Sequence, residues 1–434
     1  MPLKILIVGA GLAGFSAAIA VARNGHEVHL FERSAFSNEV GAALHFGPTT
    51  TAHVFPRWGL DAYRDFQACK VERWYNYHVK DEVMEPMPDR YILEDRRREL
   101  HFEGDEVMCH RVDAHSALRE KALSYPNVRL HLSSGVQSVD PDAGTITLKD
   151  GTLHRGDVVV GADGIHSQTV QAIAGPECVP TRAGVNIFRF FVLEEKARQN
   201  PLAAQFLDEH KFPDSHVSFR GTNGSVSVIY TARKGSYLNF GLLFPAKIAK
   251  RDLTTMDWHA TSSPDEVVDI FYDHPKFFKE LIYLGEDFKH WAFPARAISK
   301  TFVKGKLVLI GDAAHPLHPT HATGAVQGIE DAACLGELLT SDATVKDVPE
   351  RLELYNKLRY ERGVTLKCAS EVGVLAGVDP DTRLENLRKF VPNGQLPEDV
   401  DAYIWLYNPV KEAQEALRAH LKSKQSWLPN CPLM

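Results

Sequence analysis

The amino-terminal segment contains a glycine pattern that restricts the fold more than any other feature of the chain. A short apolar run, Lys4 to Val8, is followed by the loop Gly9-Ala10-Gly11-Leu12-Ala13-Gly14 and an alanine-rich stretch up to Gly25. A second apolar run, Val28 to Phe31, ends at Glu32. In a strand-helix-strand unit, such glycines allow a tight turn, close approach of a pyrophosphate and close helix packing. The pattern predicts a dinucleotide-binding βαβ unit, and a merely glycine-rich turn is the competing interpretation.

Glu32 indicates which dinucleotides fit this unit. A carboxylate at the end of the second strand accepts hydrogen bonds from both ribose hydroxyls, which favours an adenosine without a 2′-phosphate. FAD and NAD both meet that condition. The unit alone therefore leaves the choice between them open.

Two later segments repeat the pattern of a buried strand followed by a tight turn with an aspartate. Val158 to Val160 precedes Gly161-Ala162-Asp163-Gly164, and Lys306 to Ile310 precedes Gly311-Asp312-Ala313-Ala314-His315. Each aspartate could bind hydroxyl groups of a cofactor or cap the helix that follows it. The presence of both in one chain favours the cofactor role.

Length and composition limit the class of protein. At 434 residues the chain exceeds the size at which one hydrophobic core usually stops growing, so we expect two packed domains. The net charge of −7, with basic and acidic residues interspersed, argues against nucleic-acid binding. Six cysteines without a Cys-x-x-Cys pair, and no apolar run suited to a signal peptide or membrane span, favour a reducing, cytoplasmic location without stable membrane association.

The three glycine-and-acid segments, in this order, resemble the class A FAD-dependent aromatic monooxygenases, the superfamily of salicylate hydroxylase and 4-hydroxybenzoate hydroxylase. The similarity extends from residue 3 to about residue 365. Glu39-Val40-Gly41-Ala42-Ala43-Leu44-His45-Phe46-Gly47-Pro48 is similar to the salicylate-hydroxylase branch and its fungal secondary-metabolite members, and His110-Arg111-Val112-Asp113-Ala114-His115 also resembles the family. The resemblance implies an α/β fold, with a Rossmann-like FAD-binding domain, an inserted antiparallel-sheet substrate domain and C-terminal helices.

The resemblance also implies which residues contact FAD. Glu32 would bind the adenosine ribose, Ala43 and Arg111 would border the flavin and ribityl region, and Asp312 would bind the ribityl chain. Asp163 lies in a motif associated with both FAD and the nicotinamide cofactor. The full expected cofactor-binding set is Gly9, Gly11, Leu12, Ala13, Gly14, Glu32, Arg33, Ala43, Arg111, Val136, Asp163, Gly311, Asp312, Gly324 and Ala325.

The loop before the last of these positions departs from the family pattern. Gly324-Ala325 would open a helix whose amides face the flavin pyrimidine carbonyl, where a helix N-terminus stabilises negative charge. The family usually has Pro-x-x-Gly-Gln-Gly here, whereas this chain has Pro319-Thr320-His321-Ala322-Thr323-Gly324. Thr49 replaces a common Asn, and Gln171 replaces an expected Arg. None of these changes removes a residue that performs chemistry.

Three histidines, His315, His318 and His321, invite a metal-site interpretation. Their spacing, with intervening prolines, fits neither the i, i+4 pair of a zinc protease nor a Cys/His cluster, and no acidic ligand is adjacent. We therefore expect no metal and interpret them as polar loop residues near the cofactor.

The chain divides by pattern into four parts. We expect an FAD-binding domain in residues 1–180, with an excursion of residues 73–100 toward the substrate domain, and its second part in residues 293–375. A β-sheet substrate domain would occupy residues 181–292 and a helical region residues 376–434. The strands expected in the sheet are Val185–Leu193, Ser215–Arg220, Ser225–Ala232 and Tyr237–Phe244. Residues 345–375 and 381–425 have helical periodicity.

The resemblance implies a reaction in which a nicotinamide reduces FAD, O2 adds to flavin C4a, and the hydroperoxide transfers oxygen to an electron-rich carbon. Because a phenolate is a stronger nucleophile than a phenol, a cation facing the substrate would help. Arg189 is the first candidate, since strand alternation can direct it away from its aromatic neighbours; an arginine at the matching position is associated with the substrate anion in fungal relatives. Tyr230 and His45 are further catalytic candidates. The alternatives are a structural ion pair for Arg189, sheet packing for Tyr230 and a structural role for His45.

The expected activity is that of an FAD-dependent monooxygenase that uses NADH or NADPH and O2 to hydroxylate a small phenol- or indole-type molecule in specialised metabolism. Another flavin oxidoreductase, such as a halogenase, an oxidase or an enzyme of dearomatisation or epoxidation, stays open, as does a non-catalytic dinucleotide-binding protein. The sequence leaves undecided the substrate, the choice of nicotinamide, and monomer versus homodimer. It also leaves open whether the final Cys431-Pro432-Leu433-Met434 is prenylated, although one lipid chain anchors weakly.

Overall fold

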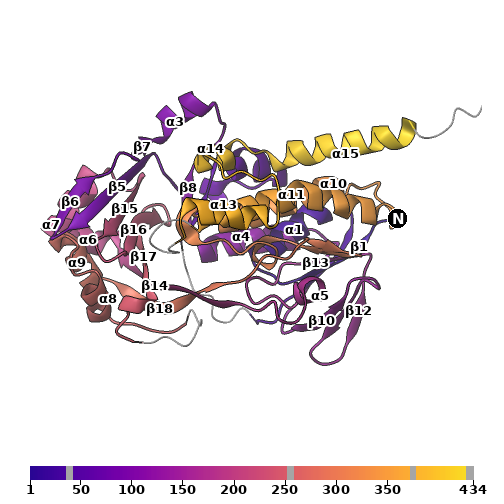
Figure 1. Cartoon of the computed structure of the whole chain (residues 1–434), viewed down its shortest axis with the longest axis horizontal. Helices are drawn as coiled ribbons and strands as arrows, with labels where there is room; N and C mark the ends of the chain where they lie inside the picture. Colours follow the sequence, from indigo (N-terminus) through magenta and orange to yellow (C-terminus); the bar gives the residue numbers. More distant parts are fainter. Residues whose placement is uncertain (36–42, 252–258, 372–377, 427–434) are drawn as a thin grey trace, which may run out of the picture.

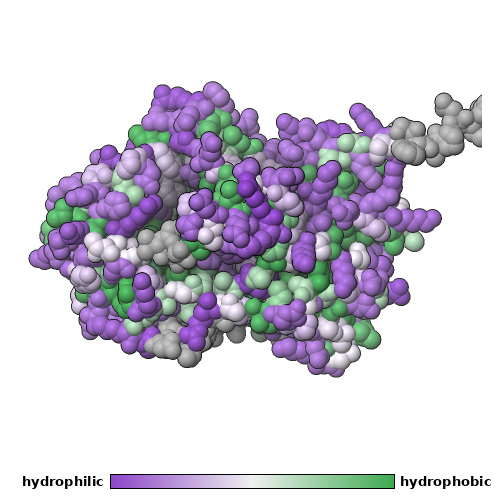
Figure 2. Space-filling model, in the orientation of Figure 1, coloured by the Kyte–Doolittle hydropathy of each residue, from purple (hydrophilic) through white to green (hydrophobic). Residues whose placement is uncertain are grey.

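The computed structural model describes residues 1–35, 43–251, 259–371 and 378–426 and has two lobes (Figure 1). The lobe on the right of the view contains the amino terminus, and the lobe on the left is built around a large sheet. The same face is largely hydrophilic in Figure 2, with apolar residues in scattered groups. The expected fold class, an α/β chain with a Rossmann-like part, an added sheet and C-terminal helices, is confirmed.

A six-stranded sheet in the order β19-β20-β13-β1-β2-β9 forms the centre of the amino-terminal lobe. Its strands are β1 (Lys4–Val8), β2 (Glu27–Phe31), β9 (Val128–His131), β13 (Val158–Gly161), β19 (Val303–Lys304) and β20 (Leu307–Leu309). All neighbours are parallel except β19 and β20. The central strands β1, β13 and β20 are almost entirely buried, which is why their sequences are continuous apolar runs.

Small residues bring two helices of this lobe into close contact. The lobe's main helices are α1 (Leu12–Ala22), α4 (Arg111–Leu123), α10 (Gly324–Leu338) and α11 (Val348–Ser370). A Cβ on Gly336 of α10 would lie 2.7 Å from the Ala20 Cβ of α1, and one on Gly328 would lie 3.0 Å from the Ala13 Cβ. Larger side chains at these positions would therefore push α1 and α10 apart.

The second lobe contains an eight-stranded sheet in the order β18-β14-β17-β16-β15-β5-β6, with β7 paired to β5. Its strands are β5 (Arg73–Lys80), β6 (Val83–Pro86), β7 (Tyr91–Ile92), β14 (Thr181–Leu193), β15 (Ser215–Gly221), β16 (Val226–Ala232), β17 (Tyr237–Pro245) and β18 (Glu286–Ala295). The four strands expected in this sheet pair antiparallel, and β5, from the expected excursion of residues 73–100, adds to it by pairing in parallel with β15. These two strands are joined by a long path through the other lobe, and parallel neighbours require such a crossover.

The two faces of this sheet differ in chemistry because side chains alternate along each strand. One face is apolar and packs on α6 (Glu194–Gln199), α7 (Pro201–Glu209), α8 (Pro264–Ile270) and α9 (Lys276–Tyr283). Its buried core includes Tyr77, Phe188, Phe190, Val217, Phe219, Ile229, Phe240 and Leu242. The other face, here called the ceiling face, carries a row of five side chains in register: Trp74, His216, Tyr230, Asn239 and Phe191.

A small sheet in the order β3-β8-β4 lies between the lobes. Its strands are β3 (Ala43–Phe46), β4 (Cys69–Lys70) and β8 (Val107–His110), and β8 leads directly into α4. Strand β3 contacts α10, and β8 contacts β16 of the large sheet. The remaining elements are α2 (Ala62–Asp65), α3 (Leu93–Leu100), α5 (Gln171–Ala174) and a meander of β10 (Val136–Asp140), β11 (Thr145–Leu148) and β12 (Leu153–Arg155).

The region expected to be helical from 381 to 425 consists of three shorter helices. They are α13 (Pro380–Arg388), α14 (Val400–Trp405) and α15 (Pro409–Ser426). Pro392, Gly394 and Pro397 separate the first two, since proline and glycine disfavour a continuous helix. Among the described helices, none combines the length and apolarity needed to cross a membrane. The prenylation pattern at Cys431 lies outside the described residues.

Candidate active site

The three signature loops meet at one edge of the parallel sheet. Strands β1, β13 and β20 are parallel neighbours, so the loops that follow them leave from the same edge. A Cβ on Gly9 (φ +98°) would lie 2.8 Å from the Asp163 Cα, and one on Gly311 (φ +57°) would lie 3.0 Å from the Ala13 Cβ. The loops around Gly9, Asp163 and Gly311 are therefore packed against one another.

At two positions of this region, neither the backbone angles nor the packing of the protein requires a glycine. Gly11 (φ −77°) and Gly324 are the only glycines among the described residues that combine ordinary backbone angles with no protein atom within 4 Å of an added Cβ. By contrast, a Cβ on Gly14 would overlap the carbonyl oxygen of Gly9. Gly11 precedes α1 and Gly324 begins α10, and helix N-termini bind anionic groups. This open cradle fits a dinucleotide that lies across both helix ends.

Glu32 lies at the end of β2, beside the first of these helix ends. Its carboxylate accepts hydrogen bonds from the backbone N–H of Ala10 (2.9 Å) and of Ser34 (2.8 Å). Arg33 is exposed, and its Cβ lies 3.5 Å from the position of an added Cβ on Gly135, the neighbour of the buried Val136. The structure thus brings Glu32, Arg33 and the start of β10 to one side of the cradle, where the adenosine end of a dinucleotide would lie.

Asp312 lies in the third signature loop with its side chain open to solvent. Burial of its surroundings raises the pKa of Asp312, while nearby His315, Arg296 and Arg111 lower it. The same residue is thus solvent-accessible and closely surrounded, as expected for the wall of a cleft. Arg296, which sequence reasoning missed, holds this loop: its Nη2 donates to the carbonyl oxygens of Asp312 (2.8 Å) and Ala313 (2.6 Å). No local sequence signal marks a side chain that binds distant backbone carbonyls.

Asp163 has a structural role in this conformation. Its carboxylate accepts hydrogen bonds from the backbone N–H of Gln168 (2.7 Å) and Thr169 (3.0 Å) and from the Thr169 hydroxyl (2.7 Å). These bonds close the turn that precedes α5, whose first residue is Gln171. Asp163 thus closes a turn and does not cap α5, whose N-cap is Val170, and its contact with a cofactor stays a prediction.

A buried ion-pair network joins the third loop to α10 and α11. Asp331 accepts from the Gly311 N–H (2.8 Å) and from Arg359 Nε (2.7 Å), and its Oδ2 lies 2.7 Å from His315 Nε2. Burial raises the pKa of Asp331, but His315 and Arg359 outweigh it and lower the pKa to about 2. Glu330 pairs with Arg359 at 2.8 Å. These contacts fix the loop that carries Asp312.

The three histidines of this region have different surroundings. His315 pairs with Asp331, His318 packs on the Phe293 ring with centroids 5.5 Å apart, and His321 has an unpartnered Nε2. No group of three potential metal ligands occurs within the described parts of the chain.

The structure shows the backbone conformation and contacts of the residues that depart from the family pattern, in the loop 319–324 and at Thr49. Ala322, at the position of a family glycine, has φ +49°, in the left-handed region that glycine adopts most easily. Thr323, at the position of the glutamine, is buried, and its hydroxyl accepts from Gln327 Nε2 at 3.4 Å. Thr49, at the position of the asparagine, donates to the Ile404 carbonyl at 3.0 Å and so ties the early loop to α14. Ala322 thus takes a left-handed conformation without being a glycine.

Arg189 lies on the ceiling face, two residues before Phe191, which ends the row of five side chains described above. Its guanidinium lies 5.4 Å from the centre of the Trp291 ring, its Nε has no hydrogen-bond partner, and it has no carboxylate partner among the described residues. Burial lowers the pKa of Arg189, Tyr230 raises it and Arg111 lowers it again. Arg111 also lowers the pKa of Asp312, so its charge acts on both the third signature loop and the ceiling face. The structural ion pair considered for Arg189 is not found among the described residues.

Tyr230 and Asn239 fasten the ceiling face to strand β3. The Tyr230 hydroxyl donates to the Ala43 carbonyl at 3.3 Å, and the Asn239 Oδ1 accepts from the Ala43 N–H at 3.4 Å. Burial raises the pKa of Tyr230 to about 12, although Arg189 lowers it. Tyr230 therefore stays protonated at neutral pH and acts as a hydrogen-bond donor. Asn239 was missed by sequence reasoning, although its place between Leu238 and Phe240 puts it on the opposite face from both.

His45 belongs to a neighbouring buried cluster. Its Nε2 lies 3.1 Å from Glu106, which also accepts from Trp74 Nε1 at 2.7 Å. The Trp74 ring stacks on His216 with centroids 3.9 Å apart, and His216 stacks on Tyr230 at 5.5 Å. Burial lowers the pKa of His216 to about 3, so this imidazole is neutral at physiological pH. Strand alternation with Val217 and Phe219 could have identified His216 as a residue of the polar face.

Unpartnered buried polar atoms gather around the ceiling face and the small sheet below it. They are His45 Nδ1, His110 Nδ1, Arg189 Nε, His216 Nδ1 and Asn239 Nδ2. Buried polar atoms in proteins nearly always have partners, and a missing ligand is one ordinary reason for an exception. These five atoms are available to form hydrogen bonds with a polar ligand under the ceiling face.

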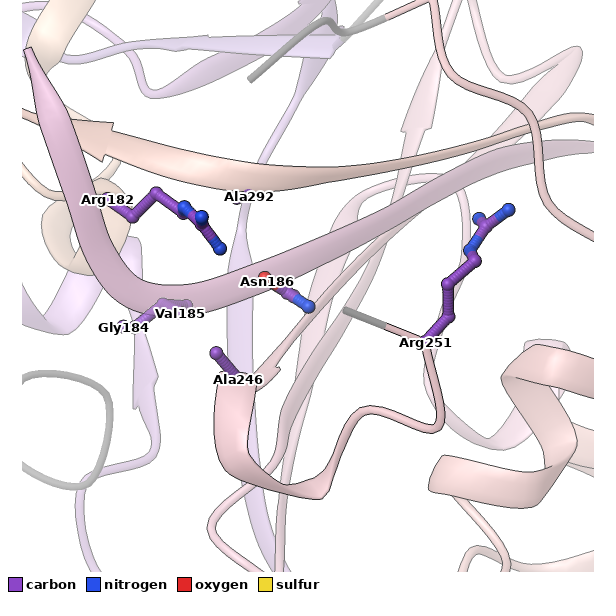
Figure 3. A pocket seen from close by; sticks show the side chains of 7 residues that line it. All are labelled: Arg182, Gly184, Val185, Asn186, Ala246, Arg251 and Ala292. Carbon is purple, nitrogen blue, oxygen red and sulfur yellow. The ribbon is translucent and has the colours of Figure 1, made fainter. Parts of the chain in front are cut away.

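Two other hollows of the molecule are not suited to this role. The first is a cavity of about 30 Å³ at the bend of β14, lined by Arg182, Gly184, Val185, Asn186, Ala246, Arg251 and Ala292 (Figure 3). It has room for about one water molecule. The second, about 580 Å³, lies on α11, α14 and α15 and is lined by residues such as Lys357, Tyr403 and Glu412, apart from the signature loops.

Comparison with known proteins agrees with this arrangement. A family profile described as "FAD binding domain" matches residues 274–370, and one described as "NAD(P)-binding Rossmann-like domain" matches residues 7–46. The fold is similar to that of CtdE in complex with FAD and a substrate (TM-score 0.76, 21% identity, 98% of this chain and 100% of that chain). It is also similar to a salicylate hydroxylase substrate complex (TM-score 0.73, 23% identity, 96% and 98% of the two chains).

Curated relatives extend over nearly the whole chain. The FAD-dependent monooxygenase cfoG of Aspergillus candidus is 31% identical over 428 residues, which cover 96% of each protein. Hispidin-3-hydroxylase of Neonothopanus nambi is 32% identical over 381 residues, covering 83% of this chain and 86% of the relative. The expected resemblance is confirmed. With the glycine cradle and the matched FAD-binding domain, this similarity shows that the chain belongs to the FAD-dependent monooxygenases and that FAD is its cofactor.

Proposed function

We propose that this enzyme uses NADH or NADPH and O2 to hydroxylate a small, electron-rich aromatic molecule that binds under the ceiling face. The observation that carries the proposal is the half-buried Arg189, whose buried Nε has no hydrogen-bond partner and which has no carboxylate partner among the described residues. A buried cation without a partner is costly, and an anionic ligand would compensate it. The relatives named as hydroxylases of hispidin and of 3-hydroxybenzoate support an aromatic ligand.

The chain's own residues can hold FAD in the cradle. Gly11 leaves room for the pyrophosphate, Glu32 would bind the ribose of the adenosine, and Asp312 would bind the ribityl chain. The N-terminus of α10 at Gly324 presents backbone N–H groups, which favour negative charge on the flavin ring. When bound, FAD would accept electrons from the nicotinamide and activate O2 for transfer to the substrate.

The residues of the ceiling face would prepare the substrate. Arg189 stabilises the ionised form of an acidic hydroxyl and so raises the electron density of the ring that is attacked. Tyr230, protonated at neutral pH, donates its hydrogen bond to the Ala43 carbonyl and so holds β3 in place. His216 and Trp74 provide a stacked aromatic wall that excludes water. His45 is engaged with Glu106, so its proposed part is to hold this wall and not to act as a base.

The test is a substrate screen with purified enzyme. Flavin absorbance measures bound FAD, and consumption of NADH or NADPH is followed with a panel of phenols and indoles. Mass spectrometry with isotopic O2 then shows whether product gains one oxygen atom from O2. Stimulated consumption with labelled product supports the proposal. Product without label would instead indicate another class of flavin oxidoreductase, and protein without FAD affinity would contradict both.

A further inference from the structure

The side-chain amide nitrogen of Asn239 donates no hydrogen bond to the described residues. The side chain is fully buried in the middle of the ceiling face, with 0% of its surface exposed. Its Oδ1 faces the Ala43 N–H, and since that group can only donate, the orientation of the amide is fixed. In the described part of the chain, the Nδ2 atom has no hydrogen-bond partner. A buried donor in this state costs free energy unless a ligand supplies an acceptor.

The position of Asn239 relative to Arg189 defines a two-point site. On the paired strands β14 and β17, Asn239 lies opposite Phe191 and Arg189 lies opposite Gly241. The two side chains are diagonal neighbours on one face, with Cα atoms about 7–8 Å apart in such pairs. Gly241 contributes no side chain between them. A cation and a neutral donor therefore face the same space with nothing from β17 in the way.

We propose that Asn239 determines substrate specificity by donating a hydrogen bond to a carbonyl oxygen of the substrate, while Arg189 binds an ionised hydroxyl. This inference rests on the proposed function and narrows its substrate class. The substrate is a phenol or cyclic enol that carries a conjugated carbonyl group. A simple phenol leaves Nδ2 unpaired, and an indole without oxygen substituents leaves both groups unpaired, so both classes bind more weakly.

A matched pair of probes isolates the carbonyl group. In 2,4-dihydroxyacetophenone and 4-ethylresorcinol the two hydroxyls are the same, and the carbonyl of the first is a methylene in the second. Dissociation constants of the FAD-bound enzyme are measured from the change in flavin absorbance on titration. The wild-type enzyme is expected to bind the acetophenone at least tenfold more tightly.

Variants assign that preference to one atom. Asn239→Ala is expected to reduce the preference to twofold or less. Tyr230→Phe is the matched control, because Tyr230 also contacts the Ala43 backbone but donates to its carbonyl oxygen. It is expected to keep at least a fivefold preference, whatever its effect on the two affinities. A purely structural role of Asn239 would change both affinities equally. If Asn239→Ala loses FAD, Asn239→Asp keeps the acceptor for Ala43, lacks the donor and is expected to favour 4-ethylresorcinol.

Two results would overturn the inference. One is equal binding of the two probes by the wild-type enzyme, and the other is an unchanged preference in Asn239→Ala or Asn239→Asp. Either result is compatible with the proposed function if phenols still stimulate consumption of NADH or NADPH. Failure of every phenol to do so would instead contradict the proposed function itself.

Discussion

Replacement of Gly11 by alanine should weaken FAD binding much more than it lowers the stability of the protein. The backbone at Gly11 has φ −77° and ψ −169°, an extended conformation that alanine also adopts. Apart from the two chain neighbours, no atom of the described residues lies within 4 Å of the added Cβ. The expected cost to the protein is limited to the N-cap position of α1, where alanine is less favourable than glycine by about 1 kcal/mol. In a chain of this size the unfolding midpoint of the FAD-free protein should fall by only about 1–3 °C.

The same methyl group enters the space assigned to the pyrophosphate. Forcing an extra methyl into a close contact typically costs about 1–3 kcal/mol. That cost corresponds to a decrease in FAD affinity of about 5- to 150-fold. Isothermal titration of FAD-free protein with FAD gives the affinity, and thermal unfolding of the same preparation gives the stability.

Two further glycines provide the comparison for this experiment. Gly14→Ala should prevent stable folding, because the added Cβ would overlap the Gly9 carbonyl oxygen. Gly324→Ala should behave like Gly11→Ala, with near-normal stability and weaker FAD binding, since its Cβ also meets no protein atom within 4 Å. Wild-type FAD affinity in Gly11→Ala would refute the assignment of the cradle to the cofactor.

Three other substitutions test separate parts of the structure. Arg189→Ala should retain FAD yet form coupled product at least tenfold more slowly, and unchanged single-turnover hydroxylation would remove Arg189 from the catalytic residues. Arg359→Met should destabilise the fold by about 3–5 kcal/mol, because Glu330 and Asp331 lose a buried partner; a loss below about 1 kcal/mol in denaturant unfolding would contradict this role. Burial and nearby carboxylates raise the pKa of Asp401 from 3.8 to about 6, so the folded state binds this proton more tightly than the unfolded state. The stabilisation from this proton is complete below pH 3.8 and is lost as the pH rises through 6. Asp401→Asn should therefore exceed the wild-type free energy of unfolding by up to about 3 kcal/mol at pH 8 and by less than about 1 kcal/mol at pH 4. A gain in stability that does not depend on pH would argue against the raised pKa of Asp401.

The cofactor half of the site could be predicted from sequence because its signals are local. The glycines at 9, 11 and 14 and the acids Glu32 and Asp312 each follow a strand within a few residues, and strand ends of a parallel sheet share an edge. Asp163 shows the limit of such signals. The same short pattern serves a cofactor or a local turn, and in this structure the turn uses the carboxylate.

The substrate half was predicted less completely because it depends on register between distant strands. Arg189 and Tyr230 could be proposed from their strands, but their relation to Asn239 follows only from the pairing of β14, β16 and β17. Trp74 stacks on His216 because β5 and β15 pair in parallel, although the two strands lie far apart in the sequence. No sequence signal marks Arg296, since its partners are backbone carbonyl oxygens, which every residue has.

The order of elements along the chain has a consequence for biosynthesis. Strands β13 and β20 are hydrogen-bonded neighbours, yet all strands from β14 to β18 are synthesised between them. Helix α10, which covers the alanine surface of α1, emerges later still. A nascent chain that ends before residue 307 therefore exposes an unpaired edge of β13 and an apolar helix surface. Folding of the first lobe has to wait for the last third of translation, and prematurely terminated chains are natural targets for chaperones and proteases.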